Sequence, residues 1–207
     1  MPIPTTNATQ ELPAVNQILA SVGQAPVTTL DQTNPDVAIA YDTLLQVSKE
    51  VQAEGWTFNQ EFEYEIVTDN NKEYQIPNNM LQVDFSESYK GNIDPVRRDG
   101  KLYDRYNHTY ELGDTAGDEF KVDVVWFFDW IDLPAPVQNY IVAKAATIAA
   151  QRIIGDPQLI QTLQQREALA RANALEYECN QGDFTIFGHP EGNRHYTSYK
   201  PYTALQR

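Results

Sequence analysis

Apolar residues recur at three- and four-residue steps in the first part of the chain, which predicts two helices. The first covers residues 13–22, with Pro13 in its first turn, where a missing N–H group is tolerated. The second opens with Asn34 as its capping residue and Pro35 at the first helical position, and it stops at Gly55. The predicted buried faces comprise Leu12, Val15, Ile18, Leu19 and Val22 in the first helix, and Val37, Ala40, Tyr41, Leu44, Leu45, Ser48 and Val51 in the second.

From Trp56 onward the pattern alternates with a period of two, which is typical of strands. Further strands are predicted at Met80–Phe85 and Glu119–Trp126, and Asp99-Gly100 indicates a hairpin turn within residues 95–106. Short strands joined by turns predict a small antiparallel sandwich or barrel. In the first strand we expect a buried side of Phe58, Gln60, Phe62, Tyr64 and Ile66, and a solvated side of Glu61, Glu63 and Glu65.

Helical periodicity returns after Leu133 and continues to about Asn180, with a break at Gly155, Asp156 and Pro157. The order of elements is therefore helix, helix, β insert, helix, helix and tail. We predict an α+β fold in which residues 1–55 and 133–180 form one antiparallel helical bundle domain. Residues 56–132 form an inserted β domain, and residues 181–207 form an extended C-terminal arm.

The composition describes a folded, acidic chain: 42% of its 207 residues are hydrophobic and the formal net charge is -14. A protein that binds nucleic acid through its surface presents a basic face, so this charge argues against that class. The acids between Glu111 and Asp132, set against Lys121, predict either an ordinary solvated face or a face that repels DNA. No run of about 18 apolar residues and no signal sequence is evident. We therefore expect no membrane anchor and synthesis in a cytoplasm.

The search for chemistry yields little. His189, Glu191 and His195, with Asp183 nearby, match no dependable ligand spacing, and a Gly-rich segment is a poor frame for a metal. There is no nucleophile elbow, phosphate-binding loop or dinucleotide motif. The single cysteine, Cys179, is expected to be a small packing residue. We therefore expect no metal, no cofactor and no enzymatic activity.

One enzymatic alternative stays open, because glutamates alternate with aromatic residues in the first predicted strand, as they do in some sugar-binding clefts. Under this alternative the chain is a glycan hydrolase that uses carboxylates of the β domain. A strand with one buried aromatic side and one wet acidic side explains the same pattern more simply.

Two segments are candidates for contacts with other proteins. The loop at residues 23–33, which contains Gln24 and Pro26, is expected to be exposed. The tail is rich in aromatic side chains, which provide large contact areas at interfaces. We predict that the tail packs on another subunit; the alternative is that it folds back on its own β domain. Its candidate interface residues are Phe184, Phe187, Tyr196, Tyr199 and Tyr202.

Three sequence segments carry a resemblance to a known family: ELPAVNQILASVGQAPVTTL followed by EGWTFN, the triplet YDR at residues 103–105, and VAKAATIAAQRIIGDP. In these the chain resembles the tail tubular protein A family, the head-to-tail adaptors of short-tailed bacteriophages. The resemblance spans nearly the whole chain up to Asn180. A generic oligomeric scaffold unrelated to phage is the weaker alternative.

The resemblance implies a helical bundle with a β domain, assembled as a dodecameric ring in the virion, at the head–tail junction. The ring joins the portal protein to the tail nozzle of the tubular protein B type, and tail fibres attach near the same place. DNA is expected to pass through the lumen without specific binding. The loop with Gln24 and Pro26 is then a candidate contact with a neighbouring subunit or with the portal.

Overall fold

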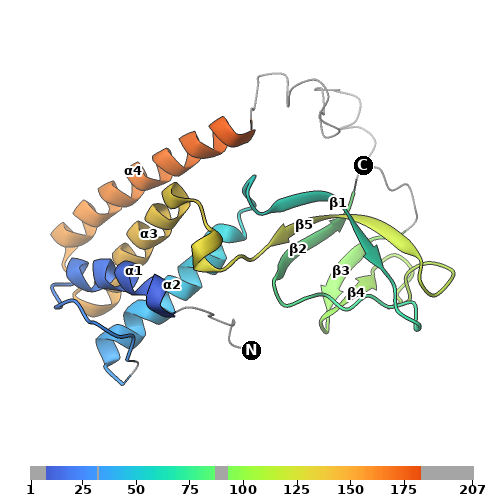
Figure 1. Ribbon diagram of the computed structural model, residues 1–207, viewed down its shortest axis with the longest axis horizontal. Helices are drawn as coiled ribbons and strands as arrows, with labels where there is room; N and C mark the ends of the chain where they lie inside the picture. Colours follow the sequence, from blue (N-terminus) through green and yellow to red (C-terminus); the bar gives the residue numbers. More distant parts are fainter. Residues whose placement is uncertain (1–7, 32, 87–92, 183–207) are drawn as a thin grey trace. The chain divides into compact units, whose positions relative to one another are not determined.

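The computed structural model describes residues 8–31, 33–86 and 93–182 (Figure 1). These residues confirm the predicted α+β class and divide into two compact units. The sheet unit contains Leu45–Leu133 together with the described residues up to Leu12. The helix unit contains Pro13–Leu44 together with the described residues from Pro134 onward. The elements are α1 (Ala8–Ser21), α2 (Pro35–Gln52), β1 (Gln60–Val67), β2 (Met80–Phe85), β3 (Pro95–Arg98), β4 (Lys101–Asp104), β5 (Glu119–Trp126), the short 3-10 helix η1 (Trp130–Asp132), α3 (Ala135–Ile153) and α4 (Pro157–Gly182).

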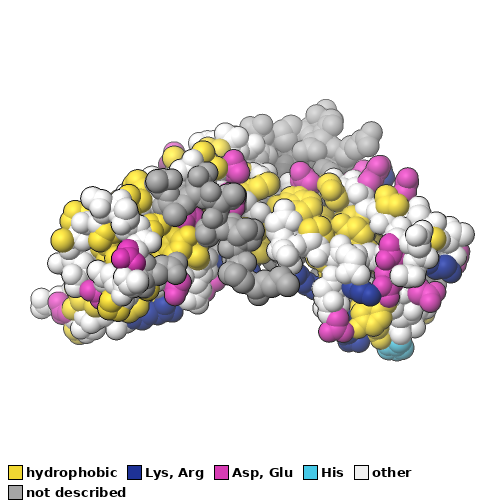
Figure 2. All heavy atoms as spheres, turned by 60° about the horizontal axis from the view of Figure 1, so that its bottom comes forward, with side chains coloured by type: hydrophobic (Ala, Val, Ile, Leu, Met, Phe, Trp, Pro, Cys, Tyr) yellow, Lys and Arg dark blue, Asp and Glu magenta, His cyan; other side chains and the backbone are white. Residues whose placement is uncertain are grey.

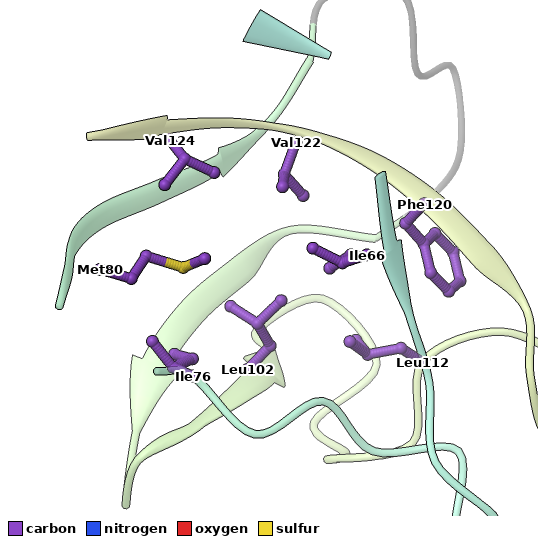
Figure 3. Close-up of a cluster of buried hydrophobic side chains, with 8 residues drawn as sticks. All are labelled: Ile66, Ile76, Met80, Leu102, Leu112, Phe120, Val122 and Val124. Carbon is purple, nitrogen blue, oxygen red and sulfur yellow. The ribbon is translucent and has the colours of Figure 1, made fainter. Parts of the chain in front are cut away.

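The sheet unit is built from two antiparallel sheets. One has three strands in the order β1-β5-β2, and the other is the β3–β4 hairpin. Among the described strands the sheets stay open, so the barrel alternative is wrong. Apolar side chains from both sheets and from the connecting loops point toward one another and form the core (Figure 3). The core comprises Ile66, Ile76, Met80, Leu102, Leu112, Phe120, Val122 and Val124.

The β3–β4 hairpin closes through Asp99 and Gly100, as the sequence predicts. Both residues have positive φ, 50° and 75°, and Arg98 lies opposite Lys101 across the turn. Two successive residues with positive φ are the signature of a type I′ turn, whose twist matches that of the two strands. Glycine takes the second position because it has no side chain to oppose this conformation.

β1 departs from the predicted alternation at a β-bulge. Glu61 lies opposite Val124 and Tyr64 lies opposite Val122, so β1 has one residue more than β5 between these two pairs. At the bulge Glu63 adopts a φ of 53°, and its N–H group donates to a carboxylate of β5 at 3.0 Å. The extra residue changes which side chains face the core, because a strand alternates its faces with a period of two.

The bulge explains one error of the sequence analysis. The sequence predicts that Phe62 and Tyr64 are buried, but they are 44% and 38% exposed. The bulge accounts for Phe62, because Glu61 takes the core-side position opposite Val124; Tyr64 stays on the core side, opposite Val122, and is exposed at the edge of the sheet. Ile66, two residues further on, is buried as predicted. β1 is also an edge strand of its sheet, and bulges are common at such edges because they interrupt pairing with other chains.

The two N-terminal helices follow the prediction apart from one boundary. α1 begins at Ala8, so Pro13 lies inside the helix and not in its first turn. A proline inside a helix removes one backbone hydrogen bond and costs stability, yet α1 continues through Pro13 to Ser21. The cap of α2 is confirmed, because Asn34 Oδ1 accepts the N–H group of Asp36 at 3.0 Å. The predicted positions that are buried include Val15, Ile18, Leu19, Val22, Val37, Ala40, Tyr41, Leu44, Ser48 and Val51.

α3 and α4 pack against each other in the helix unit. The break between them has the predicted chemistry: Gly155 has a φ of 70°, and Asp156 Oδ1 accepts the N–H group of Gln158 at 3.1 Å. α3 has a large buried face rich in alanine, whereas the buried residues of α4 are Leu163 and Ala174. Cys179 is consequently exposed, so its predicted role in packing is wrong.

Candidate functional site

The segment at residues 55–59 folds into a buried polar junction at the point where helix gives way to sheet. Asn59 is 1% exposed, and its side chain makes three hydrogen bonds. Its Oδ1 accepts the N–H group of Trp56 at 2.8 Å, and its Nδ2 donates to the carbonyls of Gln52 and Trp126, both at 2.8 Å. Asn59 therefore ties together the end of α2, the start of β1 and the end of β5.

Two more side chains complete this junction. The Gln52 amide is buried and forms a reciprocal pair with the backbone of Phe128, donating to its carbonyl at 3.1 Å and accepting its N–H group at 2.8 Å. The Trp56 indole N–H group donates to the carbonyl of Val51 at 2.7 Å. Buried backbone groups need such partners, because an unsatisfied one costs about 1–3 kcal/mol. The junction, defined as Gln52, Trp56 and Asn59, fixes the path of the chain where it leaves α2 for β1 and where it leaves β5.

The YDR triplet has a second structural role. Asp104 is 1% exposed and accepts the N–H groups of Asp94 at 3.0 Å and Tyr106 at 2.8 Å, and the side-chain amide of Asn107 at 2.5 Å. Burial raises the pKa of the Asp104 carboxyl, but these hydrogen bonds outweigh it and hold the pKa below its usual value. Arg105 Nε donates to Asp94 Oδ2 at 2.8 Å, which closes the loop around the buried carboxylate.

The outer face of the β3–β4 hairpin carries a stack of one cation and two aromatic rings. The Arg98 guanidinium carbon lies 4.0 Å from the centre of the Tyr103 ring. The Tyr103 and Tyr110 rings meet edge to face with their centres 4.9 Å apart. The Tyr110 hydroxyl donates to Asp99 Oδ2 at 2.8 Å, and this bond raises the pKa of Tyr110. The stack is therefore anchored to the hairpin turn at its Tyr110 end.

The outer face of the three-stranded sheet is acidic. The cross-strand pairs Glu65–Lys121 and Asp84–Asp123 share the face that points away from the core, together with Glu119. Two aspartates directly opposite each other repel, since like charges on neighbouring strands are destabilising. Figure 2 shows Asp and Glu side chains spread over the visible surface of the protein, with fewer Lys and Arg among them.

The three glutamates of β1 do not form one site. Glu61 is opposite Val124, on the core side of the sheet, and its carboxylate accepts the indole N–H group of Trp126 at 2.8 Å. Glu65 lies on the opposite face, and Glu63 pairs with Lys121 at 3.4 Å. A glycan hydrolase needs two carboxyl groups that flank one substrate bond. The hydrolase alternative therefore gains no support from this strand.

The described residues offer no metal-binding group and no membrane-spanning helix. In the part of the chain that the structure describes, no group of three or more His, Cys, Asp or Glu side chains could hold a metal ion. The weak metal candidates Asp183, His189, Glu191 and His195 lie outside the described residues. Among the described helices, none has the length and apolar character needed to cross a membrane.

The predicted contact loop is exposed at both residues singled out from the sequence, Gln24 and Pro26. Asn16 of α1 holds the loop, because its side chain accepts the N–H group of Val27 at 2.8 Å and donates to the carbonyl of Val27 at 3.0 Å. The other candidate interface residues lie outside the described residues: Phe184, Phe187, Tyr196, Tyr199 and Tyr202.

The sequence analysis missed the Arg98–Tyr103–Tyr110 stack, although part of its signal was present. A two-residue turn at Asp99-Gly100 pairs residue 98 with 101 and residue 96 with 103. Residues 98 and 103 then become diagonal neighbours on one face, which is within reach of long and aromatic side chains. The contribution of Tyr110 has no such signal, because it comes from the loop after β4.

Comparison with known proteins gives one informative result. The model of the tail tubular protein family matches residues 12–184, which include both compact units. No curated protein matches the chain. This match indicates a structural role in a phage tail. The chain therefore belongs to the tail tubular protein family.

Proposed function

We propose that the chain is a tail tubular protein of type A, the head-to-tail adaptor of a short-tailed phage. In this proposal twelve copies form a ring that joins the portal protein to a tail nozzle of type B and offers a place for tail fibres. The observation that carries the proposal is the family match over residues 12–184, supported by the resemblance at residues 11–30, 54–59 and 103–105.

The charge distribution supports a passage for DNA. Of the 29 Asp and Glu residues, 19 lie in Leu45–Leu133, against 8 Lys and Arg, so the sheet unit holds most of the negative charge. Adhesion to DNA requires basic side chains that displace counterions from the phosphates. A ring whose lumen is lined by this acidic surface lets DNA pass without being retained.

The arrangement of the protein within the tail is part of the proposal. The two pairs of helices form one bundle, interrupted by the β domain. The loop with Gln24 and Pro26 contacts the portal or a neighbouring subunit, and the aromatic arm at residues 181–207 packs on the next subunit. Each contact needs an exposed or aromatic surface, and the loop residues meet this requirement.

Electron microscopy of the full chain mixed with its portal protein tests the adaptor role. We expect twelve-fold rings seated on the portal, and rings that then capture the nozzle protein. A chain that binds neither portal nor nozzle at micromolar concentration would overturn the proposal. Portal alone and nozzle alone serve as controls for rings formed by those proteins.

Matched variants test the two contact segments. Replacing Gln24 and Pro26 with aspartate should weaken portal binding or ring formation, whereas Ala116→Asp, in an exposed turn of the sheet unit, should not. Replacing Tyr196, Tyr199 and Tyr202 together with alanine should weaken ring formation while the isolated chain keeps its melting temperature. If that triple variant lowers the melting temperature and still forms rings, the arm folds back on its own β domain.

A further inference from the structure

The two sheets of the sheet unit present outer faces of different chemistry. Each sheet turns one face to the shared core, as Figure 3 shows for Val122 and Val124 of β5 and for Leu102 of β4. The other faces therefore point away from each other. On β3–β4 the outward pairs are Arg98–Lys101 and Val96–Tyr103, because the alternate position, Leu102, points inward.

The Arg98 guanidinium is exposed and oriented in a way that suits binding of a carboxylate. Among the described residues, the ion pairs of the hairpin join Lys101 to Glu73 and Arg105 to Asp94, and none involves Arg98. Its guanidinium lies over the Tyr103 ring, which orients the group while its N–H donors stay at an exposed position. A guanidinium held in one plane recognises a carboxylate with two parallel hydrogen bonds and loses little entropy on binding.

The opposite face supplies carboxylates of this kind. Its negative charges are Glu65, Asp84, Glu119 and Asp123, against Lys121, which also pairs with Glu63. The direct opposition of Asp84 and Asp123 leaves a repulsion that a cation from another molecule would relieve. The sheet unit thus carries Arg98 with its aromatic neighbours on one side and an acidic face on the opposite side.

We propose that the outer face of the β3–β4 hairpin docks on the outer face of the three-stranded sheet of a second copy of this chain. The contact is head-to-tail, with Arg98 and the Tyr103–Tyr110 pair meeting Glu65 and Glu119 of the next copy. Contacts between two different faces repeat from copy to copy and close into a ring when the rotation permits. This inference rests on the proposed ring and assigns one of its subunit contacts.

Charge complementarity also selects against other pairings. Two acidic faces repel each other, so the arrangement disfavours closed dimers made of two three-stranded-sheet faces. DNA would compete for Arg98, but the surrounding acids repel its phosphates. A second copy of the chain is therefore the occupant that fits both faces at once.

Reversal of charge, followed by mixing, tests the contact. The first variant, Arg98→Glu, makes both faces acidic; the second, Glu65→Arg with Glu119→Arg, makes both faces basic. We expect each variant alone to self-associate at least about tenfold more weakly than the natural chain, by analytical ultracentrifugation and native mass spectrometry. Mixed in equal amounts, the two should assemble again, because each then meets a complementary face, and the assemblies should contain equal numbers of both. Added salt should weaken the natural assembly.

Matched controls and the outcomes make the test decisive. Lys49→Glu and Asp42→Arg reverse exposed charges on α2 and should leave assembly unchanged. Assembly of Arg98→Glu as strong as that of the natural chain would overturn the inference while leaving the adaptor role intact. So would a mixture that fails to reassemble, or a variant that loses only the binding of a DNA duplex. If natural assemblies depend on Arg98 but do not contain twelve copies or bind the portal, the adaptor role fails and the contact stands.

Discussion

The buried side chain of Asn59 provides the sharpest test of how the fold is held together. Replacing it with alanine removes one acceptor and two donors from the junction, leaving the Trp56 N–H group and the Gln52 and Trp126 carbonyls without these partners. A buried hydrogen bond contributes about 1 kcal/mol net, and a group left unsatisfied costs about 1–3 kcal/mol. Three such groups at a 1% exposed position give an expected loss of about 3 kcal/mol.

Urea denaturation followed by tryptophan fluorescence measures this loss, since Trp56 and Trp126 lie at the junction. Asn59→Ala should lower the free energy of unfolding of the sheet unit by about 3 kcal/mol with little change in the denaturant slope. Asn78→Ala, at an exposed position in the same unit, should change it by less than about 0.5 kcal/mol. A change for Asn59→Ala no larger than that of the control would refute the role given to the amide.

Three further predictions concern the same unit. Asp104→Asn should lower the free energy of unfolding by about 1–3 kcal/mol at pH 7. Hydrogen bonds hold the pKa of Asp104 below its unfolded value of about 3.9, so this stability is present above about pH 4 and is lost as pH falls through the folded pKa. Acid titration of the natural and variant chains measures the difference. Gly55→Ala should lower the melting temperature more than Gly23→Ala: both have positive φ, but a Cβ at Gly55 would lie 2.5 Å from Gln60 Nε2, whereas nothing lies within 4 Å at Gly23. Leu102→Ala, at a fully buried core position, should cost about 2–5 kcal/mol in urea denaturation, and a cost below about 1 kcal/mol would contradict its place in the core.

Local chemistry made some elements predictable and left others out of reach. The cap at Asn34 and the turn at Asp99-Gly100 depend on a few adjacent residues, and both form as predicted. The bulge at Glu63 depends on a carboxylate of β5, Asp123, which lies sixty residues away in the sequence. Alternation within β1 alone could therefore not show that Phe62 would be exposed. The start of α1 was missed for a similar reason. The residues before Pro13 show no clear apolar repeat, so the pattern could not indicate that the helix begins ahead of Pro13.

The residues of the candidate site also divide into those that the local sequence indicates and those that only the folded structure brings together. The segment EGWTFN and the triplet YDR were noticed for their resemblance to a family, and in the structure they hold buried hydrogen bonds at Asn59 and Asp104. The side chains of Asn59 and Asp104 face inward, so these two residues preserve the fold. The residues that face outward next to them, Tyr103 and Arg98, needed the strand register to be recognised as neighbours.

This separation of roles has a consequence for a tail protein. Asp104 and Tyr103 are adjacent in sequence, and because β4 alternates its faces, one is buried against the loop and the other lies on the outer face beside Arg98. The hydrogen bonds of Asp104 thus fix the strand that presents Tyr103, so that the face proposed to contact a second copy is positioned by a buried carboxylate. An adaptor must keep its contact faces rigid while it joins partners of different shape. In the proposed adaptor, a two-sheet unit whose inward residues preserve the geometry of its outward residues would meet this requirement.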